Sequence, residues 1–326
     1  MHIHTYEDVI KACRFCFMCR HLDPVGNVTF QEADTPRGRA LLLDRVRMDP
    51  TNLGNPDYIA TVYRSALSGA NRQNCVSHYD EVGLVLAARR DIVEAGLAPA
   101  AVKALANRLS EATFTVSGKG KSLYFGSQPE LYPGCKVLSG GDPGYALLTL
   151  GFAEASQRVF ERFQSAVAAS GCQTLIVAEP SAQHFLGTRL ESVTVVPCAE
   201  ALLTSKLKRG PSRQAYYLES DFLRNYGGNS AAPRQVLAHC GYQLLPFGTN
   251  DEESYTAGEG AVVFGELQPE LAAKLCLRII SQAGDLSSNL FITPSSSVQA
   301  TLSQSNPQIR ILSLEQAVAE QQQQPS

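Results

Sequence analysis

Three cysteines crowd into seven residues near the start of the chain. Cys13, Cys16 and Cys19 stand in "ACRFCFMCRHLDPVG" with the C-x2-C-x2-C spacing that bacterial ferredoxins use to hold an iron–sulfur cluster. The ferredoxin pattern continues with x3-C-P, but here the fourth place holds Asp23, ahead of Pro24. The spacing leaves three options: a broken site, an aspartate ligand, or a fourth cysteine elsewhere in the chain.

A complementary motif lies downstream. In two-cluster ferredoxins the fourth cysteine of each motif binds the other motif's cluster, so a chain with one cluster needs a single cysteine from its second motif. The same spacing recurs in "SALSGANRQNC", which ends at Cys75. The predicted ligands of one [4Fe–4S] cluster are therefore Cys13, Cys16, Cys19 and Cys75. The places of a lost second site are Asp23, which we expect to be structural or solvated, Ser65, Ser68 and Asn71.

Two other interpretations of these cysteines remain open. A structural zinc ion can be held by four cysteines, or by three with His21 or His78, although zinc sites usually bring two close cysteine pairs. Alternatively, they are buried thiols of a helix, but thiols at this spacing would spread around the helix. If a cluster is bound, the cations Arg14 and Arg20 would offset its negative charge and raise its reduction potential.

The bulk composition excludes several classes of protein. The 326-residue chain has a net charge of −3 and an isoelectric point near 6.1, so it lacks the basic surface that nucleic-acid binding needs. The start "MHIHTYEDVI" lacks the features of a secretion signal, and the apolar runs are too short for a transmembrane segment. We expect a cytoplasmic protein that is peripheral to a membrane only through a partner.

Its nine cysteines are expected to be metal ligands and buried thiols, and no catalytic triad or carboxylate pair is found.

Residues 1–110 are predicted to form a helical domain. The predicted helices are 35–49, 77–96 and 98–113. The first begins with Thr35 as N-cap and Pro36 at the first helical position. The apolar residues expected on its inner face are Leu41, Leu42 and Val46.

From about residue 111 short apolar strands alternate with amphipathic helices, which is typical of parallel α/β layers. Strands are predicted at 121–127, 173–179, 193–198, 214–220, 260–265, 289–294 and 309–314. The strand, Pro-Ser turn, helix and second strand that begin at 173 recur from 289 with nearly equal spacing. We therefore expect a duplicated parallel-sheet α/β domain with halves 111–205 and 206–326, in preference to one larger sheet. The tail "AEQQQQPS" is expected to be frayed.

Two glycine-rich stretches resemble anion-binding loops. The stretch "VSGKGKS" lacks the first glycine of a phosphate-binding loop and precedes a strand instead of following one, so we predict a surface turn. The stretch "LSGGDPGYALLTLG" opens a helix whose free N–H groups could bind an anion, but it lacks a full fingerprint and is also assigned as a turn.

In their order along the chain, these features resemble a known family. The helical unit with "CRFCFMCRH" and "TPRGRALLL", the second motif ahead of "VLAARRDIVEAGLAP" and the duplicated α/β region are similar to the iron–sulfur subunits of glycolate oxidase, anaerobic glycerol-3-phosphate dehydrogenase and heterodisulfide reductase. The resemblance covers nearly the whole chain, with its specific motifs in the helical part. It implies an α+β multidomain fold, with a helical ferredoxin-like domain followed by the α/β domain.

The α/β region departs from the pattern of that family. Its members carry paired cysteines followed by glycine and a later C-P-x-C, but "SGGDPG", "AEPSAQ" and "TPSSSV" stand in those places. The segment "LESDFLRNYGG" resembles the family's His-Asp-Pro-Cys segment without its cysteine. Disulfide reduction at a cluster in this region is therefore not expected. The thiols without ligand spacing, which we expect to be buried, are Cys135, Cys172, Cys198, Cys240 and Cys276.

The resemblance implies an electron-transfer subunit with one [4Fe–4S] cluster and no catalytic residues of its own. It also implies a hetero-oligomer with an FAD-dependent dehydrogenase or oxidase of a hydroxy acid or polyol, to which the α/β region would be a docking scaffold. Two alternatives stay open. One is a non-redox regulatory or assembly module with a structural cluster or zinc, and the other is an enzyme that binds a small molecule between the α/β halves.

Overall fold

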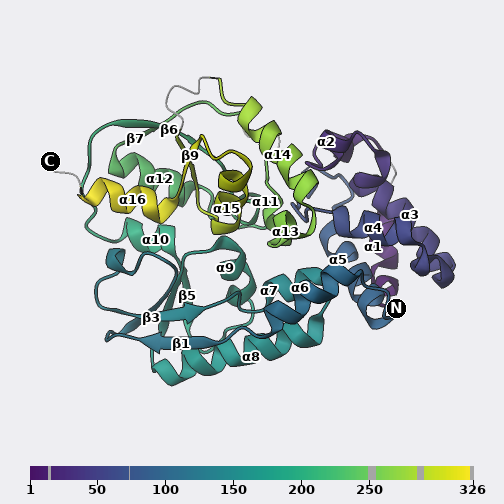
Figure 1. The fold of residues 1–326 in the computed structure, drawn as a ribbon, viewed down its shortest axis with the longest axis horizontal. Coiled ribbons are helices and arrows are strands. Elements are labelled where there is room, and N and C mark those ends of the chain that lie inside the picture. The colour runs from purple at the N-terminus through teal and green to yellow at the C-terminus, as the bar shows by residue number, and fades with distance from the viewer. Residues whose placement is uncertain (14–15, 73, 249–254, 285–289, 324–326) are drawn as a thin grey trace.

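The computed structural model describes residues 1–13, 16–72, 74–248, 255–284 and 290–323. Within these ranges the chain is a mixed α/β protein with two mostly parallel sheets, which helices cover and connect (Figure 1). The predicted combination of helices and parallel sheets is confirmed. In the same ranges, no helix has both the length and the apolar character that a membrane span requires.

The first 110 residues form helices α1 (Glu7–Ala12), α2 (Gly26–Thr29), α3 (Pro36–Met48), α4 (Pro56–Arg64), α5 (Glu81–Glu94) and α6 (Ala100–Ser110). The Thr35 hydroxyl accepts a hydrogen bond from the Gly38 N–H at 3.1 Å, so the predicted cap sets the start of α3. Asp80 caps α5 in the same way, by accepting from the Gly83 N–H at 3.2 Å. The three helices predicted in this region are confirmed, with slightly shorter bounds.

The buried face of α3 differs from the predicted one. Arg39, Leu43 and Val46 are buried, whereas Leu41 is exposed. The spacing of the buried residues is i, i+4 and i+7, which is one face of a helix. The prediction counted apolar residues only, so it missed that an arginine belongs to this face.

The first sheet contains β1 (Phe114–Ser117), β2 (Ser122–Phe125), β3 (Cys135–Gly140), β4 (Thr174–Val177) and β5 (Thr194–Pro197). Its order is β1-β3-β2-β4-β5, in which β1 is antiparallel to β3 and the other pairs are parallel. The helices of this part are α7 (Tyr145–Leu150), α8 (Ala153–Ser170), α9 (Pro180–Gly187) and α10 (Cys198–Leu203). The sequence predicts β2, β4 and β5 but not β1 or β3, because those two strands have no continuous apolar run.

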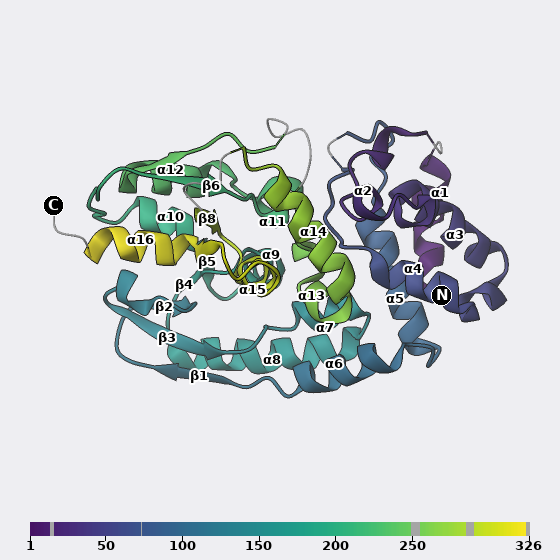
Figure 2. The ribbon, with the colours of Figure 1, turned by 45° about the horizontal axis from the view of Figure 1, so that its top comes forward.

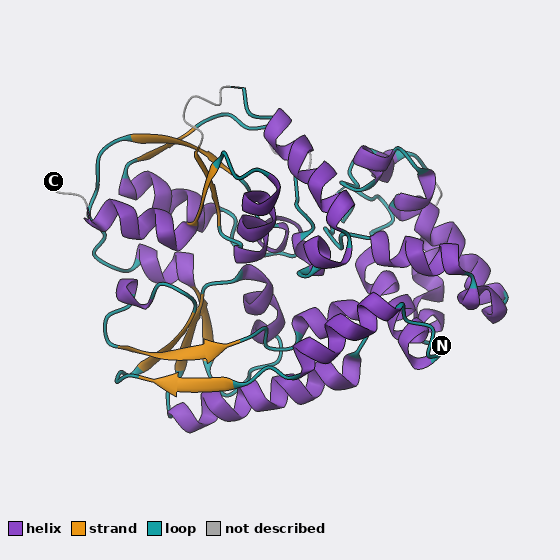
Figure 3. Cartoon of the chain, viewed as in Figure 1, coloured by secondary structure: helices purple, strands orange, loops and turns teal. Residues whose placement is uncertain are grey.

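The second sheet contains β6 (Arg213–Tyr217), β7 (Tyr242–Leu244), β8 (Leu290–Thr293) and β9 (Arg310–Ser313). Its helices are α11 (Asp221–Asn225), α12 (Ala231–Cys240), α13 (Phe264–Leu267), α14 (Pro269–Ser281), α15 (Ser296–Ser305) and α16 (Leu314–Gln323). The parallel order β7-β6-β8-β9 repeats the order β3-β2-β4-β5 of the first sheet. Figure 3 shows the two sheets as separate groups of strands. This agreement favours the repeat inferred from the sequence, while the domain boundaries stay predictions.

The predicted strand at 260–265 is wrong. Residues Glu259–Ala261 form a 3-10 turn, and α13 follows after Val262. Val262 has φ 57° and ψ −59°, and the Val263 N–H donates to the Ala261 carbonyl oxygen at 2.6 Å, which closes a three-residue γ-turn. The segment is apolar because it is enclosed by other elements, and not because it belongs to a sheet.

The predicted fraying of the C-terminal tail is also wrong as far as Gln323, where α16 ends. Gln321 is only 1% exposed, and its side-chain amide donates to the Pro211 carbonyl oxygen at 3.1 Å. The Gln322 side chain makes two hydrogen bonds to the backbone of Lys208, at 2.8 and 2.9 Å. These contacts hold a low-complexity segment in place through its amide groups.

Arg89 joins the N-terminal helices to the α/β part. Its guanidinium donates to the carbonyl oxygens of Val62, at the end of α4, and of Ser65 and Thr149, the last in α7. Burial lowers the pKa of Arg89 to about 10. One hydrophobic core continues across this joint into α7, α8 and α14, and Figure 2 shows α14 beside the N-terminal helices. The helical part therefore shares its core with the rest of the chain.

Two glutamates connect the α/β halves in opposite directions. Glu179, after β4, accepts a hydrogen bond from the Ser296 N–H at the start of α15, at 2.7 Å. Glu315, in the first turn of α16, accepts from the hydroxyls of Tyr132 at 2.6 Å and Tyr124 at 2.8 Å, both in the first half. Each half thus supplies a carboxylate that satisfies polar groups of the other.

The Glu315 contact predicts a pH dependence of stability. Burial raises the pKa of Glu315 from its ordinary 4.5 to about 7. The folded state therefore favours the protonated acid, and this contribution is complete below pH 4.5 and is lost as the pH rises through 7. Between pH 4.5 and 8 the wild type should lose roughly 3 kcal/mol of this contribution to its free energy of unfolding. Glu315→Gln has no titrating group at this position and should not show that loss. Urea unfolding at both pH values measures it.

The matched control is Glu191→Gln, the same substitution at an exposed position away from Tyr124 and Tyr132, and it should not reproduce the effect of Glu315→Gln. Equal pH profiles of Glu315→Gln and the wild type would show that Glu315 keeps an ordinary pKa in the fold.

Candidate metal centre

Cys13, Cys16 and Cys19 lie on one segment beside the start of α3. Cys13 directly follows α1, Cys16 is exposed, and Cys19 belongs to a 3-10 turn. The backbone N–H of Arg37, in the first turn of α3, donates a hydrogen bond to Cys19 and thereby lowers the pKa of its thiol. A helix N-terminus with free N–H groups favours a thiolate, so α3 is placed to stabilise a sulfur ligand.

The three thiols are close enough to affect one another. Burial raises the pKa of the Cys19 thiol to about 11, and the Arg37 N–H opposes this rise. The Cys13 and Cys16 thiols and the Asp23 carboxyl raise the pKa of Cys19 further, since each of them brings a like charge. A metal or cluster would have to displace the proton of Cys19 on binding.

Cys75 lies on the loop between α4 and α5, and this loop returns to the start of α3. Cys75 and Cys13 pack against the same hydrophobic core. The Tyr79 hydroxyl, four residues later, donates to the Pro36 carbonyl oxygen at 3.4 Å. Burial raises the pKa of Tyr79 well above its usual value, and the nearby Cys13 and Cys19 thiols add to this rise. The fold therefore brings the two cysteine-bearing segments together.

In the described part of the chain, the cysteines do not belong to a group of ligand atoms that the structure already holds close together. Among the described residues, the ligand atoms that lie within 4.8 Å of one another in a group of three belong to His2, Asp91 and Glu94, and the cysteines form no such group. A tetrahedral zinc site places its sulfur ligands about 4 Å apart. In a cluster each cysteine binds a different iron atom, so the sulfur atoms stand further apart.

The group of His2, Asp91 and Glu94 has a structural explanation. The Asp91 carboxylate accepts from the N–H groups of His2 at 2.6 Å and Ile3 at 3.0 Å. Glu94 is paired with His2 at 2.9 Å and with Arg90 at 2.8 Å. These bonds fasten the first residues of the chain to α5 and occupy the atoms that a metal would need.

The arginines and histidines that the sequence places near the cysteines differ in their surroundings. Arg20 lies 4.0 Å from the Glu32 carboxylate, so its charge is partly balanced. His21 and His78 are both exposed, and neither belongs to a group of metal-ligating atoms in the described part of the chain. Arg14 lies outside the described residues. The zinc alternative with a histidine ligand thus gains no support from these positions.

The places of the predicted second site hold a buried ion network. Between 1% and 7% of each residue is exposed at Asp23, Ser65, Ser68 and Asn71. Arg39 of α3 donates to Asp23 and to Glu81, both at 2.5 Å. The Ser65 hydroxyl reaches the same Glu81 oxygen at 3.4 Å. Two of the four places therefore face a guanidinium and its carboxylate partners.

Asp23 has a partner for each carboxylate oxygen. One oxygen accepts from Arg39, and the other accepts from the Gly26 N–H at 2.9 Å. Burial alone would lower the pKa of Arg39, but the Glu81 and Asp23 carboxylates hold it above its usual value. The Asp23 oxygens are therefore engaged in the network, which agrees with a structural role. Sequence reasoning missed Arg39 and Glu81, although the i, i+4, i+7 spacing of Arg39 with Leu43 and Val46 was available as a signal.

The other two places fix the loop to the rest of the fold. The Asn71 side-chain amide donates to the Tyr79 carbonyl oxygen at 3.1 Å. The Ser68 carbonyl oxygen accepts from the Asn225 amide of α11 at 2.8 Å. Gly260 packs so closely on this loop that a Cβ atom would lie 1.9 Å from the Leu67 carbonyl oxygen. The loop that carries Cys75 is thus positioned by the second α/β half.

The remaining cysteines are dispersed over the α/β part. Those that are buried, as predicted, are Cys172, Cys198, Cys240 and Cys276. Cys135 of β3 is only partly buried, because it packs against the edge of the core. The prediction that it is fully buried is therefore wrong. Their thiols form no metal-binding group among the residues that the structure describes.

Comparisons of this chain with family models, with curated proteins and with solved structures give no match. The interpretation of the site therefore depends on its residues and their geometry.

Removing Arg39, the cation of this ion network, is predicted to lower the free energy of unfolding strongly. Arg39→Leu would leave Asp23 and Glu81 buried without a counter-charge, and we expect a loss of about 3–5 kcal/mol in the free energy of unfolding. Urea unfolding of the metal-free protein measures this loss. Arg45→Leu on the exposed side of α3 is the control and should cost far less. Equal losses in both variants would contradict the assigned role of Arg39.

Proposed function

We propose that this chain is an electron-transfer subunit. Its cluster, a single [4Fe–4S] group, would be ligated by Cys13, Cys16, Cys19 and Cys75. The observation that carries the proposal is the meeting of the two cysteine-bearing segments at the start of α3. A bound cluster takes up and releases single electrons at a potential that depends on hydrogen bonds to its sulfur atoms and on solvent exposure.

The residues around the cysteines suit that role. The Arg37 N–H donates to Cys19, and such backbone donors stabilise sulfur ligands and tune the potential. Arg39, which is paired with two carboxylates, adds rigidity beneath the site.

The surface beside the cysteines would receive a redox partner. Cys16 is exposed, and a redox centre at the surface suits transfer between proteins because electron tunnelling falls steeply with distance. An apolar side chain is exposed directly beside three of the ligands: Phe17 (62%), Met18 (57%) and Val76 (76%). Exposed apolar groups of this kind are typical of protein interfaces.

The resemblance of the sequence supplies the class of partner. We infer a hetero-oligomer with an FAD-dependent dehydrogenase or oxidase, whose reduced flavin would deliver electrons to the cluster. The α/β part would serve as the scaffold for this partner. Its own cysteines are dispersed and mostly buried, which supports a subunit with one cluster.

The ligand set is tested by metal analysis of anaerobically purified protein. We expect about four irons and four acid-labile sulfides in the wild type, with an EPR signal after reduction by dithionite. Cys75→Ser should lose iron and alter this signal because it removes one ligand. Cys135→Ser, which changes another partly buried cysteine, is the matched control and should leave both unchanged.

The results separate the alternatives. Zinc without sulfide in the wild type would favour a non-redox regulatory or assembly module. An unaltered cluster in Cys75→Ser would remove Cys75 from the ligand set.

The partner is tested by isolation from the native host. A flavoprotein should copurify with the wild type and reduce its cluster when the substrate of the flavoprotein is added. Val76→Glu should keep the cluster spectrum but lose the flavoprotein, because it places a charge in the apolar surface. Leu203→Glu, at an exposed leucine of α10, is the control and should retain the partner. A wild-type complex without flavin would disprove this partner.

A further inference from the structure

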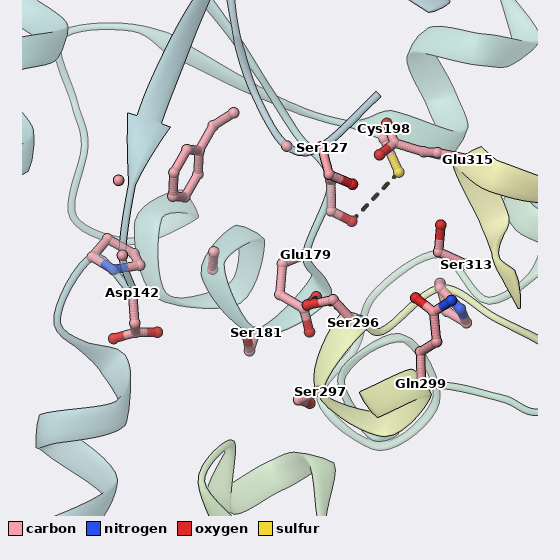
Figure 4. Close-up of a pocket in the computed structure, with 18 of the residues that line it drawn as sticks. Ser127, Asp142, Glu179, Ser181, Cys198, Ser296, Ser297, Gln299, Ser313 and Glu315 are labelled. Atoms are coloured by element: carbon pink, nitrogen blue, oxygen red, sulfur yellow. Dashed lines mark hydrogen bonds between the residues drawn. The ribbon is translucent and has the colours of Figure 1, made fainter. Parts of the chain in front are cut away.

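A cavity of about 480 Å³ lies between the two α/β halves (Figure 4). Its walls come from the carboxyl ends of β2, β3 and β4 in the first sheet and of β8 and β9 in the second. The cavity falls within the size range of small-molecule sites. None of the described residues that line it belongs to the N-terminal helices, so the cavity is distinct from the cysteine centre.

The position of the cavity is one where α/β sheets bind ligands. In the first sheet β3 lies on one side of β2 and β4 lies on the other, so the strand order reverses beside β2. In the second sheet the order reverses in the same way beside β6, but the described lining from that sheet follows β8 and β9. Ligands of open α/β sheets bind outside the carboxyl ends of the strands at such a reversal. Loops after β2, β4 and β8 all contribute to the cavity wall.

The charge of the described lining disfavours anionic ligands. Among the described residues of the wall there is no lysine, arginine or histidine, but there are three carboxyl groups, on Asp142, Glu179 and Glu315. Burial raises the pKa of Asp142 to about 6, and the Glu179 carboxylate adds to this rise. Burial also raises the pKa of Glu179. A phosphate or carboxylate ligand would meet these groups without a compensating cation.

The carboxyl groups are held in fixed positions. One oxygen of Asp142 accepts from the N–H groups of Gly144 at 2.9 Å and Ala146 at 2.8 Å at the start of α7. Glu179 and Glu315 are fixed by their contacts across the two halves. Acceptors that are already ordered bind donors without a further entropic cost. The hydroxyls of Ser181 and Ser297 lie on the same wall and are labelled in Figure 4.

The rest of the wall is apolar and in one place strained. Phe125, Leu138 and Val262 line the cavity. Val262 is a β-branched residue at φ 57°, a strained conformation that is concentrated at functional sites. The cavity therefore combines an apolar surface with a rim of hydrogen-bond acceptors.

We propose that this cavity binds a small molecule that carries hydroxyl or amino groups, has an apolar face and lacks phosphate and carboxylate groups. The donors of the ligand would bind the carboxyl and hydroxyl oxygens of the wall, and its carbon skeleton would lie against Phe125 and Leu138. Uncharged polyols, sugars and nucleosides have such donors and carbon skeletons, and so do organic amines. The proposal is independent of the cluster and goes beyond electron transfer.

The chain lacks tryptophan, so a single introduced indole reports on the cavity without background. Ser127→Trp places the indole at an exposed position of the wall, and Ser303→Trp places it at an exposed position of α15 outside the wall. Both full-length variants are titrated with adenosine, glucose and spermidine, and with AMP and glucose 6-phosphate as the matched anions. We expect a saturable emission change in Ser127→Trp with at least one non-anionic probe, and none in Ser303→Trp. Calorimetry on the wild type gives the affinity of that probe.

Asp142→Asn distinguishes ligands that bind through hydroxyl groups from ligands that bind through charged amino groups. It keeps the oxygen that caps α7 but removes the charge, so amine binding should weaken about tenfold or more and hydroxyl binding should weaken less. The proposal is overturned if the phosphorylated probes bind as tightly as their uncharged counterparts. It is also overturned if no non-anionic probe gives a saturable response, or if Ser303→Trp responds equally.

Discussion

The pairing of the Arg39 guanidinium with Asp23 and Glu81 is the constraint on which the N-terminal part depends. The guanidinium of Arg39 is buried beside two carboxylates, which come from the turn after the cysteine motif and from α5. The network therefore fixes the cysteine segment, α3 and α5 relative to one another. Two of the positions at which a two-cluster protein would need cysteines, Asp23 and Ser65, face this network. For this reason we propose one cluster and not two.

The same principle, polar groups satisfied across elements, also organises the α/β part. Glu179 and Glu315 each leave their own half to satisfy groups of the other, and both contribute to the wall of the cavity. Holding the halves together thus creates an acidic site without cations between them. Arg89 and a shared hydrophobic core join the helices that carry the candidate redox site to α7, α8 and α14 of the α/β part.

Sequence reasoning succeeded where a local pattern has one physical meaning. The Thr35 cap, and the apolar runs that became β2, β4, β5, β6, β8 and β9, were predictable because they depend on neighbours in the sequence. It failed at 260–265, where an apolar run is a buried turn, and at Gln321, where a polar side chain is buried by a distant carbonyl group. Burial among distant elements decides such cases, and periodicity does not report it.

The sequence by itself determined the cysteine spacing, the complementary motif that ends at Cys75, the Thr35 helix cap and the repeated pattern of strand, turn, helix and strand. Each of these depends on the types of residues a few positions apart. Only the tertiary structure decided that Arg39 replaces an apolar residue in the core, and that Glu315 meets Tyr124, which lies 191 positions earlier. It also decided that the cavity has acids but no cations among its described residues. These features depend on which charges and hydroxyls become neighbours inside the fold, where an unpaired polar group is costly and a paired one is stable.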